Sequence, residues 1–279
     1  MKKIIINLLI IIILTITVQI SWSQSPWVRS PKKAYLQLGA SAVTYNRVVI
    51  NDKVITTNRS NYDITTQFYA EYGLFKNTEL NAILPYKLLG YKNPVTKGNE
   101  VLNGLGNIQV GLKHMLMDKN YKLSAGVFTN LNTGSENQIN GLRTGFRSNT
   151  VQPYLTLGTS KNGMYFYVLG GYGIMDNKHA DFLRIAGEIG KAITPKMHLI
   201  VCTELRKSIN YGEFGKTDAV LFSENGLYLD EQQYLTFGLK ANYEFIPGKM
   251  GATISAYGAA YVRNVAAGPA INLSFYRKI

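Results

Sequence analysis

The chain has 279 residues and a formal net charge of +13, and it contains 19 tyrosines, 26 glycines and a single cysteine. One cysteine excludes an intramolecular disulfide framework and a cysteine-based metal cluster. The basic charge would suit nucleic acid, but no nucleic-acid-binding motif accompanies it. The favoured counter-charge is therefore anionic lipid or the phosphate of lipopolysaccharide at a cell surface.

The N-terminus has the pattern of a secretory signal peptide. Two lysines precede an apolar run over residues 4–20, and Ser21-Trp22-Ser23 matches a small-x-small cleavage site. We predict a signal peptide over residues 1–23 and a mature chain that begins at Gln24. An uncleaved membrane anchor is the alternative, which the absence of a following basic cluster disfavours. No later apolar run approaches the roughly 18 residues of a membrane-spanning helix, which leaves the periplasm, the outer membrane or the exterior.

The stretch over residues 62–75 carries the clearest secondary-structure signal. Apolar side chains such as Ile64 and Phe68 alternate with polar ones such as Asp63 and Gln67, which is the period of a strand with two different faces. Strands of soluble sheets usually have about 5 to 6 residues, whereas roughly 9 to 11 tilted residues cross a bilayer. This run has the membrane-spanning length, and a Lys-Asn-Thr turn after it predicts a hairpin.

The same alternation recurs along the chain and predicts twelve strands. Their approximate ranges are 34–44, 62–75, 79–86, 107–113, 121–127, 151–157, 165–168, 183–189, 197–206, 234–245, 250–261 and 270–279. Polar loops are expected at 45–61, 87–105, 133–149 and about 210–230, and most of the other connections are short turns.

These features predict an all-β fold, a single-chain transmembrane antiparallel β-barrel of about 12 strands. An open sheet edge cannot be hydrogen-bonded in lipid, so the strands must close, and an even strand number with alternating long loops and short turns is typical of outer-membrane barrels. The barrel would span residues 34–279 and follow a short periplasmic N-terminal segment, residues 24–33. A soluble sandwich or lipocalin-like barrel is the alternative, which the strand lengths and the lack of a helix layer disfavour.

Charged and large polar side chains fall on the polar face of their strands, which in a membrane barrel faces the lumen. The candidate lumen-lining residues are Asp63, Gln67, Glu71, Lys113, Tyr154, Tyr165, Tyr167, Arg184, Glu188, His198, Glu204, Arg206, Lys240 and Glu244.

The last strand resembles the C-terminal signal that the barrel assembly machinery recognises. Apolar residues alternate from Ile271 through Leu273 to Phe275, and the chain then continues with Tyr-Arg-Lys-Ile instead of ending on the aromatic residue. The assembly machinery is therefore an expected partner, together with outer-membrane lipid.

Several short motifs together resemble the outer-membrane family named after the MetA pathway of phenol degradation. They are Trp27 with Lys33-Ala34-Tyr35, Tyr72-Gly73-Leu74 with Leu84-Pro85-Tyr86, Gly104-Leu105-Gly106-Asn107-Ile108 and Thr133-Gly134. The family usually has Asp at the position of Asn107 and Pro at that of Asn132. The resemblance implies a barrel that passes or binds small, often apolar molecules, and it supplies no catalytic residues.

The lumenal charges allow two interpretations. Arg184, Arg206 and Lys240 could face Glu71, Glu188 and Glu204 across an open channel and orient a solute. Alternatively these charges pair with one another and keep a filled interior satisfied. Since only about ten residues separate Gln24 from the first strand, we expect no N-terminal plug.

An enzyme and a surface-binding barrel are two further classes. His198 and Cys202 lie four residues apart on one strand, roughly 13 Å, too far for a catalytic pair, and we predict neither enzymatic activity nor a cofactor. The predicted loops carry a basic rim that suits lipopolysaccharide, although solvated loops explain the same charges. The sequence thus predicts an integral outer-membrane pore for passive passage of a small, hydrophobic or aromatic solute, with a non-conducting structural or surface-binding barrel as the alternative.

Overall fold

The computed structural model describes residues 24–92, 98–137, 141–210, 212 and 227–279. The predicted signal peptide at residues 1–23 lies outside this described part. Among the described residues, there is no helix with the length and hydrophobicity of a membrane span.

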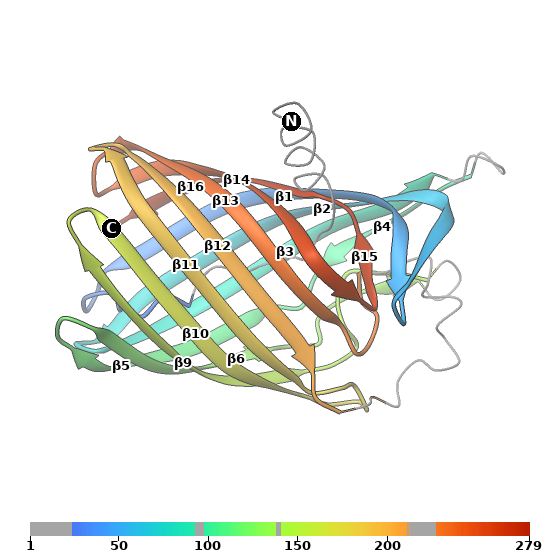
Figure 1. Cartoon of the computed structure of the whole chain (residues 1–279), viewed down its shortest axis with the longest axis horizontal. Coiled ribbons are helices and arrows are strands. Elements are labelled where there is room, and N and C mark those ends of the chain that lie inside the picture. The colour runs from blue at the N-terminus through green and yellow to red at the C-terminus, as the bar shows by residue number, and fades with distance from the viewer. Residues whose placement is uncertain (1–23, 93–97, 138–140, 211, 213–226) are drawn as a thin grey trace, which may run out of the picture.

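Within the described residues, twelve strands form a closed antiparallel ring, since β1 pairs with both β2 and β16 (Figure 1). They are β1 (Ala34–Ile50), β2 (Lys53–Phe75), β3 (Thr78–Lys92), β5 (Gln109–Asp118), β6 (Lys122–Asn130), β9 (Thr150–Lys161), β10 (Met164–Met175), β11 (Phe182–Thr194), β12 (Met197–Ser208), β13 (Gln233–Ile246), β14 (Met250–Arg263) and β16 (Ala270–Lys278). Four short strands, β4 (Asn99–Leu105), β7 (Glu136–Asn137), β8 (Leu142–Arg143) and β15 (Val265–Ala267), extend the ring or lie in its connections. The predicted all-β barrel of about 12 strands is confirmed.

The two ends of the barrel differ. Tight turns, including the one at 162–163, join β2 to β3, β5 to β6, β9 to β10, β11 to β12 and β13 to β14 at one end, the turn end, which also holds the C-terminus (Figure 1). Asn162 and Gly163 both have positive φ angles, 52° and 72°, as a two-residue hairpin turn of type I′ requires. The opposite end, the loop end, carries the longer connections at 131–149 and 209–232.

Alternation along each strand separates an apolar outside from a polar inside. On β11, Leu183 and Ile185 are exposed on the outer surface, whereas the Arg184 between them is buried in the interior. The same holds for Ile64 and Phe68 outside β2 and Asp63 inside it. A continuous exposed apolar belt is unfavourable in water and favourable against acyl chains.

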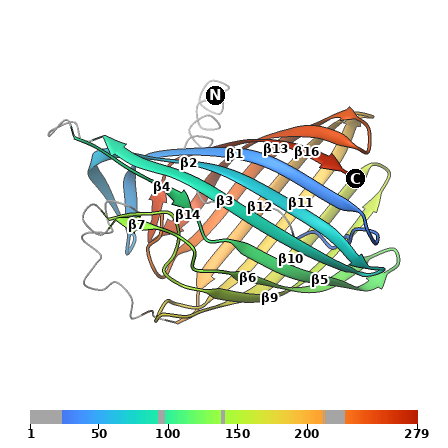
Figure 2. The ribbon, with the colours of Figure 1, turned by 180° about the vertical axis from the view of Figure 1, so that it is seen from behind.

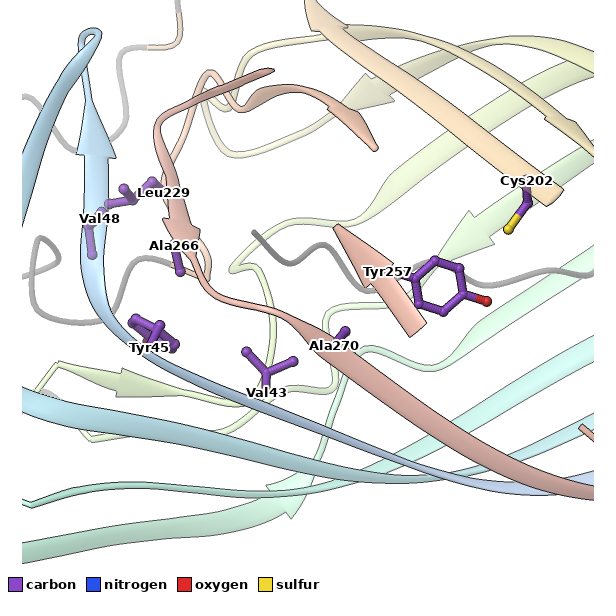
Figure 3. Packing of buried hydrophobic residues seen from close by; sticks show 8 residues of the cluster. All are labelled: Val43, Tyr45, Val48, Cys202, Leu229, Tyr257, Ala266 and Ala270. Atoms are coloured by element: carbon purple, nitrogen blue, oxygen red, sulfur yellow. The ribbon is translucent and has the colours of Figure 1, made fainter. Parts of the chain in front are cut away.

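The prediction of a loop at residues 45–61 is wrong. β1 continues to Ile50, β2 begins at Lys53, and the two-residue turn Asn51-Asp52 has positive φ at both positions. Below this hairpin β15 pairs with β1, and a cluster of buried side chains that includes Tyr45 and Val48 packs against Ala266 and Leu229 (Figure 3). The sequence suggests a loop here because the strand extension lies beyond the membrane, where its Asn, Thr and Arg side chains are solvated and need not alternate with apolar ones.

The prediction of a loop at residues 87–105 is also wrong, because strands cover most of this range. β3 runs to Lys92 and pairs with β4 towards the loop end and with β5 towards the turn end (Figure 2). The region predicted as the loop at 133–149 contains the small β7–β8 hairpin. Most of the predicted 210–230 loop lies outside the described residues.

Candidate functional site in the barrel lumen

The N-terminal segment, residues 24–33, enters the lumen from the turn end. The Lys113 ammonium on β5 donates to the carbonyls of Ser25 and Trp27 at 2.9 and 2.7 Å, and Ser124 Oγ on β6 donates to the Pro26 carbonyl at 2.6 Å. Gln24 Oε1 accepts from Arg184 Nη1 at 2.5 Å. The expectation that these residues leave the lumen free is wrong, because buried side chains on the wall bind the segment's carbonyls.

Aromatic packing and a close backbone approach hold the same segment. The Trp27 ring meets Tyr165 and Tyr167 edge-on, with centroids 5.8 and 6.3 Å apart. Near β1, Lys32 N donates to the Gly73 carbonyl and Gly73 N donates to the Lys33 carbonyl, both at 2.9 Å. A Cβ on Gly73 would lie 2.1 Å from the Ser30 carbonyl oxygen, so only glycine admits this contact.

Ion pairs concentrate on one side of the lumen, the inner faces of β2, β3, β5, β6, β9, β10 and β11, which we call the filled side. The pairs are Arg29–Glu71, Lys87–Asp63, Lys113–Glu79, Arg184–Glu204 and Lys240–Glu188, and the last two join β11 to β12 and to β13. Buried charges are tolerated only when they are paired and hydrogen-bonded. These contacts match the second interpretation of the lumenal charges, in which they neutralise one another.

A cavity of about 550 Å³ remains beside this filled side. Towards the turn end it is bounded by polar and small side chains of the open side, by which we mean the inner faces of β12, β13, β14, β16 and β1. These include His198, Asn242, Ser255, Asn272, Ser274 and Lys278. Towards the loop end its lining includes Phe146 and Tyr228. The cavity therefore runs along most of the barrel.

Residues 131–137 and 141–149, which follow β6, fold inward at the loop end. Asn107 Nδ2 donates to the Phe146 carbonyl at 3.0 Å, and a Cβ on Gly145 would lie 2.1 Å from Asn107 Oδ1. Thr133 Oγ1 donates to the Gly106 carbonyl at 2.7 Å. The Gly-Leu-Gly-Asn-Ile and Thr-Gly motifs of the sequence thus fix the loop that places Phe146 against the cavity.

A second contact ties the 176–181 turn to the segment before β13. Asp230 Oδ1 accepts from the Ala180 amide at 3.0 Å and lies 3.3 Å from His179 Nδ1. Burial alone would raise the pKa of Asp230, but hydrogen bonds from His179 and from the Ala180 and Glu231 amides hold that pKa below its ordinary value. In the same segment, burial raises the pKa of Tyr228 well above its ordinary value, so its hydroxyl stays protonated and donates to the Thr144 carbonyl at 3.1 Å.

The structure places all fourteen candidate residues on the inner face, in two groups of seven. Gln67, Tyr165, Glu188, His198, Arg206, Lys240 and Glu244 border the cavity. Asp63, Glu71, Lys113, Tyr154, Tyr167, Arg184 and Glu204 are buried in ion pairs or aromatic contacts instead.

Five further residues face the lumen without having been predicted to do so: Arg29, Lys87, Phe146, Phe182 and Tyr228. Lys87 lies in a predicted loop, and its ammonium is 3.0 Å from Asp63 Oδ2. Phe182 directly precedes the predicted strand at 183–189, whose alternation, extended by one residue, would have placed it inside.

No protein-family model matches the sequence, and no curated protein matches it. Among solved structures, the COG4313 outer membrane channel from Pseudomonas putida F1 superimposes with a TM-score of 0.69 at 14% identity, over 93% of this chain and 100% of that one. This chain folds as an outer-membrane β-barrel. The barrel also resembles the translocator domain of the autotransporter NalP from Neisseria meningitidis, at a TM-score of 0.54, 11% identity and 89% coverage of both chains. The KdgM porin matches with a TM-score of 0.50 at 7% identity, over 85% of this chain and 98% of that one.

At identities of 7–14% the likeness shows the fold alone, a closed β-barrel of the kind found in outer-membrane proteins. The resemblance to the MetA-pathway family stays a prediction.

Proposed function

We propose that this outer-membrane barrel is a channel for passive passage of a small, partly apolar solute. The observation that carries the proposal is the cavity of about 550 Å³, which extends from Lys278 and Glu244 at the turn end to Phe146 and Tyr228 at the loop end. This volume lies within the roughly 300–1,000 Å³ range of small-molecule sites. The wall combines amides and hydroxyls with aromatic rings, which suits a solute with both polar and apolar parts.

The route follows the open side, past Ser41 on β1 and Ser255 on β14. Short side chains there leave space that the ion-paired side fills. A narrow route of this kind admits small ions and solutes one at a time. The channel of Pseudomonas putida F1 and the KdgM porin share the barrel architecture, which supports the proposal at the level of fold.

Single-channel recording in planar bilayers tests the proposal. The wild-type barrel should give small, steady, ohmic steps. Ser41→Trp places a large ring in the cavity and should lower the step size severalfold, whereas Thr66→Trp on the outer face of β2 should leave it unchanged. Silence from pure, folded, heat-modifiable protein would overturn the channel proposal.

The non-conducting barrel remains the second candidate, because the filled side shows that much of this lumen is built for stability. A structural or surface-binding barrel would be silent in bilayers and insensitive to Ser41→Trp. It would also retain its basic outer rim, and lipopolysaccharide phosphate is the ligand that this rim would suit.

We further propose export by a signal peptide over residues 1–23 and insertion by the barrel assembly machinery. Cleavage after Ser23 would leave the N-terminal segment, residues 24–33, as the start of the mature chain, and its first residue would be the one that contacts Arg184. The intact mass of protein purified from outer membranes should correspond to residues 24–279. A mass that includes residues 1–23 would contradict the predicted cleavage.

A further inference from the structure

Arg206 lies on the inner face of β12, near the loop end of the cavity. It stands directly opposite Arg184 of β11 in the strand register, and it borders the cavity. Glu204 lies two residues away on the same face. Two arginines therefore meet in this part of the lumen with a single glutamate between them.

The glutamate is already used by its other neighbours. Glu204 Oε2 lies 2.7 Å from Arg184 Nη2, and Glu204 Oε1 accepts from the Tyr234 hydroxyl at 2.9 Å. Within the described part of the chain, no carboxylate oxygen lies within 4 Å of the Arg206 guanidinium, and its buried Nε has no hydrogen-bond acceptor. The guanidinium contacts the Tyr234 hydroxyl, and its Nη2 lies 3.6 Å from the Met175 sulfur.

Neighbouring charges differ from Arg206 in this respect. Lys87 is paired with Asp63 at 3.0 Å, and His179 Nδ1 lies 3.3 Å from Asp230. The Arg206 region therefore carries about one uncompensated positive charge. A buried charge without a partner is unfavourable, and a monoanion is the species that would neutralise it.

Aromatic rings surround the guanidinium and leave part of it available. Arg206 Cζ lies 3.6 Å from the Phe182 ring centroid and 5.7 Å from that of Phe146. Phe146 in turn meets Tyr228 edge-on at 5.3 Å. A guanidinium stacked on a ring still presents its N–H edge, which matches the two oxygens of a carboxylate. The rings supply an apolar surface next to that edge.

We infer that the Arg206 pocket, formed with Phe146, Phe182 and Tyr228, binds monocarboxylates with an aromatic or compact apolar body. The carboxylate sits on the Arg206 edge and the apolar body lies among the rings. This inference names the substrate class of the lumenal route and so rests on the proposed channel function, although binding itself does not require conduction. The cavity volume of about 550 Å³ accommodates such a molecule.

Benzoate, with benzamide and benzylamine as neutral and cationic counterparts, tests the inference on the full barrel in detergent and in planar bilayers. Calorimetric titration should give a benzoate affinity about tenfold or more above that for benzamide, with no binding of benzylamine. In bilayers benzoate should reduce the ionic current. Arg206→Met should abolish both effects, while Lys207→Met, which removes an outward-facing charge from the next residue, should change neither.

Arg206→Lys keeps the positive charge but changes the shape of the group, so it tests the two separately. Because the charge is kept, this variant is also less prone to a folding defect than Arg206→Met. It should retain weak benzoate binding, because the lysine ammonium keeps the charge but loses the planar fork and the ring stacking. Equal affinities for benzoate and benzamide, or full affinity in a folded Arg206→Met barrel, would overturn the inference.

The two proposals fail separately. A conducting barrel that ignores benzoate keeps the channel and removes the carboxylate site. A silent barrel that binds benzoate through Arg206 keeps the site and removes the channel.

Discussion

The filled side and the open side of the lumen are built from different side chains. The filled side carries long charged residues, such as Lys113 and Arg184, whose charges meet carboxylates and the carbonyls of the N-terminal segment. On the open side, short neutral side chains such as Ser41, Ser255 and Asn272 line the cavity between a few charged ones. Charge pairing therefore stabilises one wall, while the proposed solute route follows the other.

The Lys113 ammonium explains why so short a segment stays inside. An ammonium has three N–H donors, and two of them here reach the carbonyls of Ser25 and Trp27 at 2.9 and 2.7 Å, while the nitrogen lies 3.0 Å from Glu79 Oε1 in an ion pair. Without the segment, two donors would be buried without acceptors, which costs about 1–3 kcal/mol each. The N-terminal segment and the barrel wall therefore stabilise each other.

The largest expected effect comes from Lys113→Met, which breaks the filled side. It leaves Glu79 buried without its cation, and loss of one partner of a buried pair costs about 3–5 kcal/mol. Denaturant unfolding of the barrel in liposomes should show this loss. Lys122→Met, one strand away in a more exposed pair with Asp118, should cost about 1 kcal/mol or less.

A double variant sharpens this result. Glu79→Gln combined with Lys113→Met removes both charges and should recover part of the stability lost in the single variant. Additive losses in the double variant would contradict the proposed coupling between the two buried charges.

The next effect concerns the border between the two sides. Gly73→Ala puts a methyl group 2.1 Å from the Ser30 carbonyl, which should displace the N-terminal segment and raise single-channel conductance severalfold. Gly170→Ala is the matched control, because nothing lies within 4 Å of a Cβ at that outward position. Equal conductance of Gly73→Ala and wild type would show that the segment does not limit the route.

The strands of the barrel could be predicted because a membrane imposes strict rules on each of them. Residues 62–75 had to alternate, since every second side chain meets lipid, and the resulting strand number and closure follow. The rules weaken beyond the membrane. At residues 45–61 apolar side chains such as Val48 and Val49 follow one another without alternating, and the hairpin is seen only in the strand pairing and in the positive φ angles of Asn51 and Asp52.

The filled and open sides could not be separated by the same alternation. Periodicity places Glu71, Arg184 and Arg206 inside, but it does not show which of them find partners. Pairing depends on the strand register and on a segment outside the strands: Arg29 lies 42 residues from Glu71 in the sequence. The Gly-Asn and Thr-Gly motifs were visible in the sequence, yet their role in positioning Phe146 requires the fold of the loop.

The smallest expected effect concerns the loop end, where Asp230 joins the cavity wall to the 176–181 turn. Because hydrogen bonds lower the pKa of Asp230, the carboxylate's contribution to stability is present above its unfolded pKa of about 3.9. It is lost as the pH falls through the lower folded value. Asp230→Asn should therefore reduce the unfolding free energy by about 1 kcal/mol at neutral pH, and its curve should approach that of wild type below about pH 4. Asp52→Asn, in the exposed β1–β2 turn, is the control for loss of a surface carboxylate and should leave the unfolding free energy at neutral pH unchanged. A constant difference between Asp230→Asn and wild type from about pH 3 to 7 would mean that the side-chain shape, not the charge, maintains this contact.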